Sequence, residues 1–163
     1  MGFLLNDALV LIKSSENIKL RNTIFTVGYP TSHVSYKNLI FLLNDDKYKI
    51  KKDLLNQTYL KKIYRVKKNK KINFRFFVKL LNFDNFYNID NNPKKKPTYC
   101  IDITKNNSKK FRNKADLIYD TGSLGYTKNP LAALFFLSKL LKKPLKNEKK
   151  FGQGGHYCSS TTT

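Results

Sequence analysis

Hydrophobic residues near the N-terminus recur at helical spacing. Four apolar positions follow the pattern i, i+3, i+4, i+7, and they are Leu5, Ala8, Leu9 and Ile12. This pattern predicts an amphipathic helix over residues 4–16, and the apolar run 24–27 after it predicts a short strand. Residues 28–30, Gly-Tyr-Pro, then turn the chain. Ser32 is a suitable N-cap, so we expect a second helix near residues 33–44.

The middle of the chain combines an ambiguous basic segment with a regular alternation. Residues 47–71 are basic and weakly periodic, so a pair of strands and an irregular basic arm both remain open. Residues 72–80 alternate between apolar and polar side chains, except at Phe77. Because such alternation is typical of a half-buried strand, this segment is predicted to be the clearest strand of the chain.

Residues 82–96 have the composition of a linker. They contain five Asn, Pro93 and the run Lys94-Lys95-Lys96. This composition predicts a boundary between two lobes, residues 1–90 and residues 91–163. The expected fold class is α+β, with an N-terminal helix-strand-helix-strand lobe and a C-terminal, mostly β lobe that carries an added helix.

The C-terminal lobe is expected to contain two strands and one helix. Alternating apolar residues predict strands near 99–103 and 115–119. Asn129-Pro130 places a capping side chain before a first-turn proline, which predicts the start of a helix that runs to Leu141.

The charge of the chain is strongly positive and uneven. There are 32 Lys and Arg against 11 Asp and Glu, a formal net charge of +21. Residues 1–46 contribute a net charge of 0, residues 47–114 contribute +17 and residues 115–163 contribute +4. We therefore expect a polyanionic partner that is bound mainly by the middle third and released by salt. A solvated lysine-rich surface is the simpler alternative, but the skew toward one sign argues against it, because such surfaces usually mix both signs of charge.

Several functional classes find no support in the residue pattern. Cys100 and Cys158 are far apart, and only His33 and His156 accompany them, so no zinc-site spacing exists and buried thiols are the simpler interpretation. No apolar run reaches the length of about 18 residues that a membrane span requires. The glycines near the C-terminus are not followed by Lys-Ser or Lys-Thr, which excludes a phosphate-binding loop of that type.

An enzymatic interpretation would have to use a small set of side chains. One candidate set is His156 and Cys158, which lie on one face of a predicted strand, and the other is the carboxylates Asp116 and Asp120. No third group of recognised spacing orients any of them, so we expect no enzymatic activity, no cofactor and no small-molecule substrate.

Short motifs occur along the chain in a fixed order. Residues 7–14 read Asp-Ala-Leu-Val-Leu-Ile-Lys-Ser, residues 30–34 Pro-Thr-Ser-His-Val, residues 95–97 Lys-Lys-Pro, residues 121–125 Thr-Gly-Ser-Leu-Gly and residues 154–158 Gly-Gly-His-Tyr-Cys. In this order they resemble the motifs of the ribosomal small-subunit protein S eight family. Relative to that family, the chain carries an insertion near residues 133–151.

The resemblance implies a function. A member of this family would bind the central region of small-subunit rRNA, support its assembly and touch neighbouring ribosomal proteins. Its hydroxyl and glycine loops would reach phosphates and 2′-hydroxyls in the RNA minor groove, and the lysine run would add affinity. The candidate RNA-binding residues are Ser32, His33, Lys94, Lys95, Lys96, Thr121, Ser123, Gly125, Gly154 and Gly155. The alternative for the glycine clusters is a purely structural role as turns.

Location and rival functions follow from the same composition. Lys, Asn, Ile, Phe and Tyr have A/T-rich codons, so we expect a mitochondrial ribosome or the cytoplasmic ribosome of an A/T-rich organism. The rival interpretation is a basic nucleic-acid-binding protein or nuclease of a mobile element or virus, which the same net charge would serve.

Overall fold

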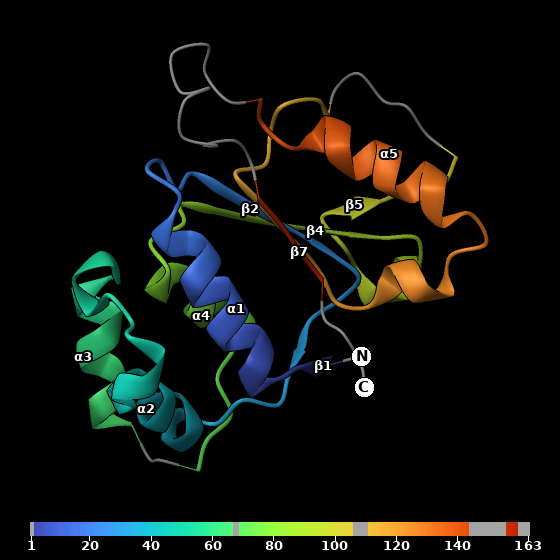
Figure 1. Ribbon diagram of the computed structural model, residues 1–163. Coiled ribbons are helices and arrows are strands. Elements are labelled where there is room, and N and C mark those ends of the chain that lie inside the picture. The colour runs from blue at the N-terminus through green and yellow to red at the C-terminus, as the bar shows by residue number, and fades with distance from the viewer. Residues whose placement is uncertain (1, 67–68, 106–110, 144–155, 160–163) are drawn as a thin grey trace.

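A parallel β-sheet lies at the centre of the molecule. The computed structural model describes residues 2–66, 69–105, 111–143 and 156–159 (Figure 1). Within these residues one sheet has the strand order β5-β4-β2-β6-β7, and all four pairings are parallel. The strands are β2 (Thr23–Val27), β4 (Asn85–Asp90), β5 (Tyr99–Cys100), β6 (Leu117–Asp120) and β7 (His156–Ser159).

The central strands are buried on both faces. Every residue of β6 is buried, as are Ile24 to Val27 of β2. Side chains of a strand point alternately to opposite faces, and accordingly Ile24 joins the hydrophobic cluster on one face while Phe25 joins the cluster on the other. Two-sided burial is typical of parallel sheets that helices cover on both faces.

Helices cover the two faces unequally (Figure 1). One face carries α1 (Leu5–Glu16), α2 (Tyr36–Asn44), α3 (Gln57–Arg65) and α4 (Phe74–Leu80), and the other carries α5 (Pro130–Leu140). A second, two-stranded sheet pairs β1 (Gly2–Phe3) with β3 (Thr31–Ser32). No helix in the described ranges is long and apolar enough to cross a membrane.

The expected fold class is confirmed, since the molecule combines helices and strands around two hydrophobic clusters. Several predicted elements are also confirmed: α1, β2, α2, β6 and α5 lie within a few residues of their predicted ranges. Asn129 caps α5 as expected, because its side chain accepts a hydrogen bond of 3.0 Å from the backbone N–H of Ala132. The proposed lobe boundary at 90/91 falls at the end of β4, whose neighbours β2 and β5 lie on either side of that boundary in sequence.

The strand predicted at 72–80 is wrong. Residues 74–80 form helix α4, and the side chain of Asn73 caps it by accepting a hydrogen bond of 2.8 Å from the N–H of Arg75. Phe74, Phe77 and Val78 are buried at helical spacing. Phe77, the exception to the alternating pattern, therefore belongs to the helical face.

Three further expectations need correction. The supposed linker 82–96 contains β4, which lies between β2 and β5 in the sheet. The basic segment 47–71 is neither a strand pair nor an irregular arm, because it contains α3. The N-cap of α2 is Ser35, whose side chain accepts from the N–H of Asn38 at 3.1 Å, while Ser32 belongs to β3.

Asp116 joins the amino ends of β2 and β6. Its Oδ2 accepts hydrogen bonds from the N–H groups of Thr23 at 2.8 Å and Asn22 at 3.1 Å. Its Oδ1 lies 2.7 Å from Nζ of Lys142, which follows α5. A buried carboxylate with three such partners is a structural clamp at this edge of the sheet.

Candidate ligand site at the carboxyl edge of the sheet

The strand order creates a switch point at the carboxyl edge. From β2 the chain passes through α2, α3 and α4 to β4 on one side, whereas β6 and β7 lie on the other side of β2. The segments that leave β2 and β6 therefore diverge. In open sheets with helices on both faces, ligands bind outside the carboxyl ends of the strands at this kind of position.

A cavity of about 700 Å³ lies at this edge. Its lining residues come from the ends of four neighbouring strands and the segments after them. They are Val27, Gly28 and Tyr29; Ile89, Asp90, Asn91 and Lys95; residues 101–105; and Thr121, Ser123 and residues 126–128. The volume falls within the range of small-molecule sites.

Gly28 allows β2 and β6 to approach closely at the switch point. Its φ is +81°, and a Cβ at this position would collide with the hydroxyls of Thr121 and Ser123. Those hydroxyls donate hydrogen bonds to the carbonyl oxygen of Val27, at 2.8 Å from Thr121 and 3.3 Å from Ser123. The N–H of Gly28 donates to the carbonyl of Ile89 at 2.7 Å. The floor of the cavity is thus held by three strands.

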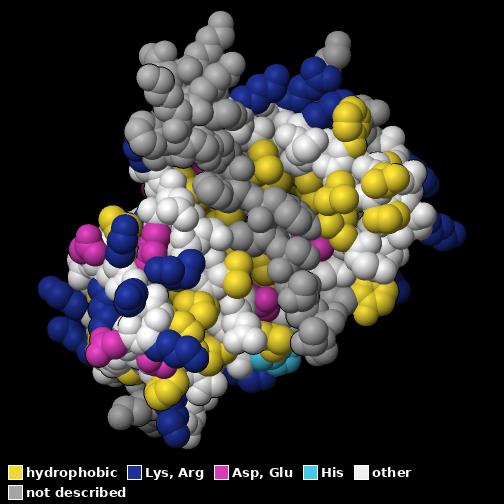
Figure 2. All heavy atoms as spheres, viewed as in Figure 1, with side chains coloured by type: hydrophobic (Ala, Val, Ile, Leu, Met, Phe, Trp, Pro, Cys, Tyr) yellow, Lys and Arg dark blue, Asp and Glu magenta, His cyan; other side chains and the backbone are white. Residues whose placement is uncertain are grey.

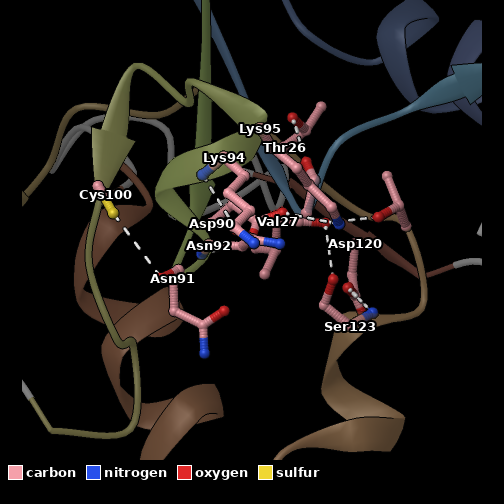
Figure 3. Close-up of polar contacts among 12 residues, drawn as sticks. Thr26, Val27, Asp90, Asn91, Asn92, Lys94, Lys95, Cys100, Asp120 and Ser123 are labelled. Atoms are coloured by element: carbon pink, nitrogen blue, oxygen red, sulfur yellow. Dashed lines mark hydrogen bonds and ion pairs between the residues drawn. The ribbon is translucent and has the colours of Figure 1, made fainter.

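Asp90 ends β4 and faces the cavity. Its Oδ1 accepts a hydrogen bond of 2.9 Å from the N–H of Asn92, and its Oδ2 lies 3.2 Å from Nζ of Lys95. Figure 3 shows this turn beside Val27, Asp120 and Ser123. Because Lys95 is half-exposed, its ammonium can move away and leave an acceptor oxygen of Asp90 for a ligand.

Asp102 is a second carboxylate that lines the cavity. It accepts hydrogen bonds from Oγ1 of Thr104 at 2.6 Å and from the N–H of Thr104 at 2.9 Å. These two bonds, followed by the charge of Lys105, lower the pKa of Asp102 from its ordinary value of 3.8. Asp102 is therefore an anion at neutral pH.

Asp120 serves the fold and does not present a free carboxylate. It is buried and accepts hydrogen bonds from the N–H of Ser123 at 2.7 Å and of Leu124 at 3.3 Å. These donors are the first turn of the short 3-10 helix η5 (Ser123–Tyr126). Their occupation by Asp120 means that this turn does not offer them to a bound anion.

The carboxylates do not form a metal centre in the described ranges. No group of three His, Cys, Asp or Glu side chains there is arranged to hold a metal ion. Asp116 and Asp120, considered together for catalysis in the sequence, lie at opposite ends of β6. The side chains of His156 and Cys158 lie outside the part of the structure that is described.

The predicted RNA-binding residues divide into three groups. Lys95, Thr121 and Ser123 line the cavity, and Lys94, Lys96 and Gly125 lie on the same two turns. Ser32 and His33 lie in and directly after β3 and do not line the cavity. Gly154 and Gly155 lie outside the described residues. Thr121 is buried, and its hydroxyl donates a hydrogen bond to the carbonyl oxygen of Val27.

The cavity-lining residues that sequence reasoning missed include Gly28, Tyr29, Asp90, Asp102 and Tyr126. A usable signal existed. Gly28 follows the strand-like segment 24–27 and Asp90 follows the segment 86–89, which is rich in aromatic and β-branched residues, and parallel strands present ligand-binding residues at such ends. The signal at Asp90 was hidden because the Asn-rich composition around it indicated a linker.

Comparison with known proteins gives no relative. No family model, curated protein or solved structure matches this chain. The resemblance to the S eight family therefore stays a prediction, and the function must be inferred from the site itself.

Proposed function

We propose that this chain binds a nucleoside-containing ligand in the cavity at the carboxyl edge of the sheet. The observation that carries the proposal is the position of the cavity at the switch point of the strand order β5-β4-β2-β6-β7. Asp90 supports it, since an acidic residue at the end of the strand beside the first one is suited to bind ribose hydroxyls. Asp102, at the next strand end, adds a second acceptor for hydroxyl or amino groups.

The residues at the floor of the cavity favour a ligand that places no phosphate group there. A pyrophosphate site in such folds uses a glycine-rich turn that leads directly into a helix. Here Gly28 is followed by Tyr29 and Pro30, and α2 begins only at Tyr36. The first turn of η5 is no substitute, because Asp120 occupies its N–H groups. Near Asp90 and Asp102, carboxylates without an anion cradle favour neutral or cationic polar groups, whereas the exposed Lys105 and Lys128 of the same lining can contact anions at the mouth of the cavity.

Calorimetric titration with a panel of nucleosides tests the proposal. We expect adenosine, which carries no phosphate, and S-adenosylmethionine, whose sulfonium and amino groups are positive, to bind more tightly than NAD or ATP, which both carry phosphates. Asp90→Asn should weaken binding about tenfold, because it removes a charged acceptor. Asp84→Asn is the matched control, since Asp84 is exposed and precedes the same strand. No binding by any member, or tightest binding of ATP, would contradict the proposal.

A second candidate function is RNA binding, as the sequence predicts. The observation that favours it is the exposure of Lys94, Lys95 and Lys96 on a turn beside the cavity, within the segment of net charge +17. Figure 2 shows further Lys and Arg side chains over the α2 and α3 region. A place in the small ribosomal subunit, at its central rRNA and in a mitochondrion, remains the specific form of this proposal.

Sedimentation of extract tests the ribosomal form. A ribosomal constituent should travel with the small subunit and leave it only at high salt. A chain that stays at the top of the gradient at low salt would contradict the ribosomal role. That result would not bear on the proposed nucleoside site. The prediction that the chain is not an enzyme is tested separately, by incubating the bound nucleoside with RNA; a mass change in either molecule would contradict it.

A further inference from the structure

Two exposed tyrosines stand at the mouth of the cavity. Tyr29 follows β2 and is 52% exposed, and Tyr126 ends η5 after β6 and is 79% exposed. Both line the cavity, although they are far apart in the sequence. Isolated exposed aromatic residues are common, but two that the fold brings to one opening indicate a binding site.

The backbones behind both rings are fixed. The N–H of Gly28, directly before Tyr29, donates to the carbonyl of Ile89 at 2.7 Å. Asp120 caps the turn that carries Tyr126, and the hydroxyl of Thr127 donates to the carbonyl of Leu124 at 3.1 Å after it. The rings are therefore presented on ordered turns, which lowers the entropy cost of binding a flat partner.

The charge around the rings indicates what that partner is. Lys105 and Lys128 line the same cavity and are exposed, and Lys94 and Lys96 are exposed on the neighbouring turn. Aromatic rings interleaved with lysines are the arrangement by which proteins hold single-stranded nucleic acid, the rings stacking on bases and the ammonium groups contacting phosphates. A duplex cannot offer its base faces to these rings, because they are stacked inside the helix.

We propose that Tyr29 and Tyr126 form a stacking platform for a base of single-stranded RNA at the mouth of the cavity. Phosphates on either side of that base contact Lys105 and Lys128. The inference rests on the proposed function, since it takes the cavity as a nucleoside site and adds the polynucleotide as the second partner. It also gives the exposed lysines of the basic segment 47–114 a binding role next to that site.

RNA carrying a single 2-aminopurine tests the platform directly, because stacking quenches the fluorescence of this base. Binding of the single strand should quench it, and Tyr29→Leu and Tyr126→Leu should each weaken binding roughly 5- to 100-fold and restore the fluorescence. Tyr29→Phe and Tyr126→Phe keep the ring and should bind like the unmodified protein. Tyr64→Leu is the matched control, since Tyr64 is a 48% exposed tyrosine on α3 that does not line the cavity.

The outcomes separate this inference from the proposed function. Titration of S-adenosylmethionine into the same leucine variants reports on nucleoside binding in the absence of RNA. Unchanged RNA affinity and unchanged quenching in both leucine variants would overturn the platform, whether or not the nucleoside binds. Equal losses for single-stranded and duplex RNA would also overturn it, because only charge would then be at work. Quenching without any binding of nucleosides would support the platform and contradict the proposed nucleoside ligand.

Discussion

The hydroxyl of Thr121 donates a hydrogen bond of 2.8 Å to the carbonyl oxygen of Val27 and so ties the end of β6 to the end of β2. These two strands are where the paths of the chain diverge, and their ends would otherwise be free to separate. Gly28 passes directly under this contact. The junction that shapes the floor of the ligand site thus leaves no room for a Cβ at residue 28.

Gly28→Ala should destabilise the protein by about 1–3 kcal/mol. The new Cβ would collide with Thr121 and Ser123, and alanine would have to adopt a φ of +81°. Urea unfolding measures the change in free energy. Gly125→Ala is the control, because a Cβ there meets no atom within 4 Å. If both variants unfolded at the same urea concentration, the close approach at Gly28 would be disproved.

Asp116→Ala should lower the free energy of unfolding by about 1–3 kcal/mol, because the N–H groups of Asn22 and Thr23 lose a charged acceptor. Lys142→Ala should cost less than about 1 kcal/mol, since that ammonium is partly exposed. Chemical denaturation of both variants checks the order. A larger effect from Lys142 would mean that the ion pair, and not the backbone contacts, holds this edge.

The triple change of Lys94, Lys95 and Lys96 to Ala should weaken RNA binding at every sequence tested. It should flatten the dependence of log K on log salt by roughly two to three units, because each lysine that contacts a phosphate releases a counterion. Fluorescence anisotropy at several salt concentrations gives the slope. A control triple change of Lys19, Lys139 and Lys143, which lie outside residues 47–114 and do not line the cavity, should leave the slope unchanged.

The ionisation of Asp102 should depend on Thr104. Hydrogen bonds from Thr104 lower the pKa of Asp102 below 3.8, so its contribution to stability is complete above about pH 4 and is lost as the pH falls through the lowered value. Thr104→Val removes the 2.6 Å bond from the hydroxyl and should move the pKa back up. Carbon-13 NMR titration of the carboxyl group measures both values. An identical titration in the two proteins would contradict the assignment.

Local patterns predicted those elements whose burial follows one simple period. The α1 segment carries helical spacing, α5 begins at the capping pair Asn129-Pro130, and β6 is a short apolar run. The alternation at 72–80 led to the wrong strand prediction because two patterns overlap there. Phe74, Phe76 and Val78 fit the period of two residues of a strand, and Phe74, Phe77 and Val78 fit the period of a helix. The Asn73 cap decides between them, and tertiary packing on α1 to α3 stabilises the result.

The site could be predicted only in part, for a reason of topology. Lys95, Thr121 and Ser123 were identified from motifs, and all three line the cavity. Gly28 and Asp90 were missed because their meaning depends on which strands are neighbours, and parallel pairing joins segments that are distant in sequence. Short-range periodicity carries no information on that order.

The central position of β2 also constrains how the chain acquires its structure during synthesis. Thr23 pairs with Asn85 on one side, and Ile24 pairs with Leu117 on the other. The first strand of the five-stranded sheet to be made must therefore wait with unpaired edges until much of the polypeptide has left the exit tunnel. Such distant pairings slow folding and leave unpaired strand edges exposed to other nascent chains. Expression yield should accordingly respond to chaperone supply more than to the strength of any single helix.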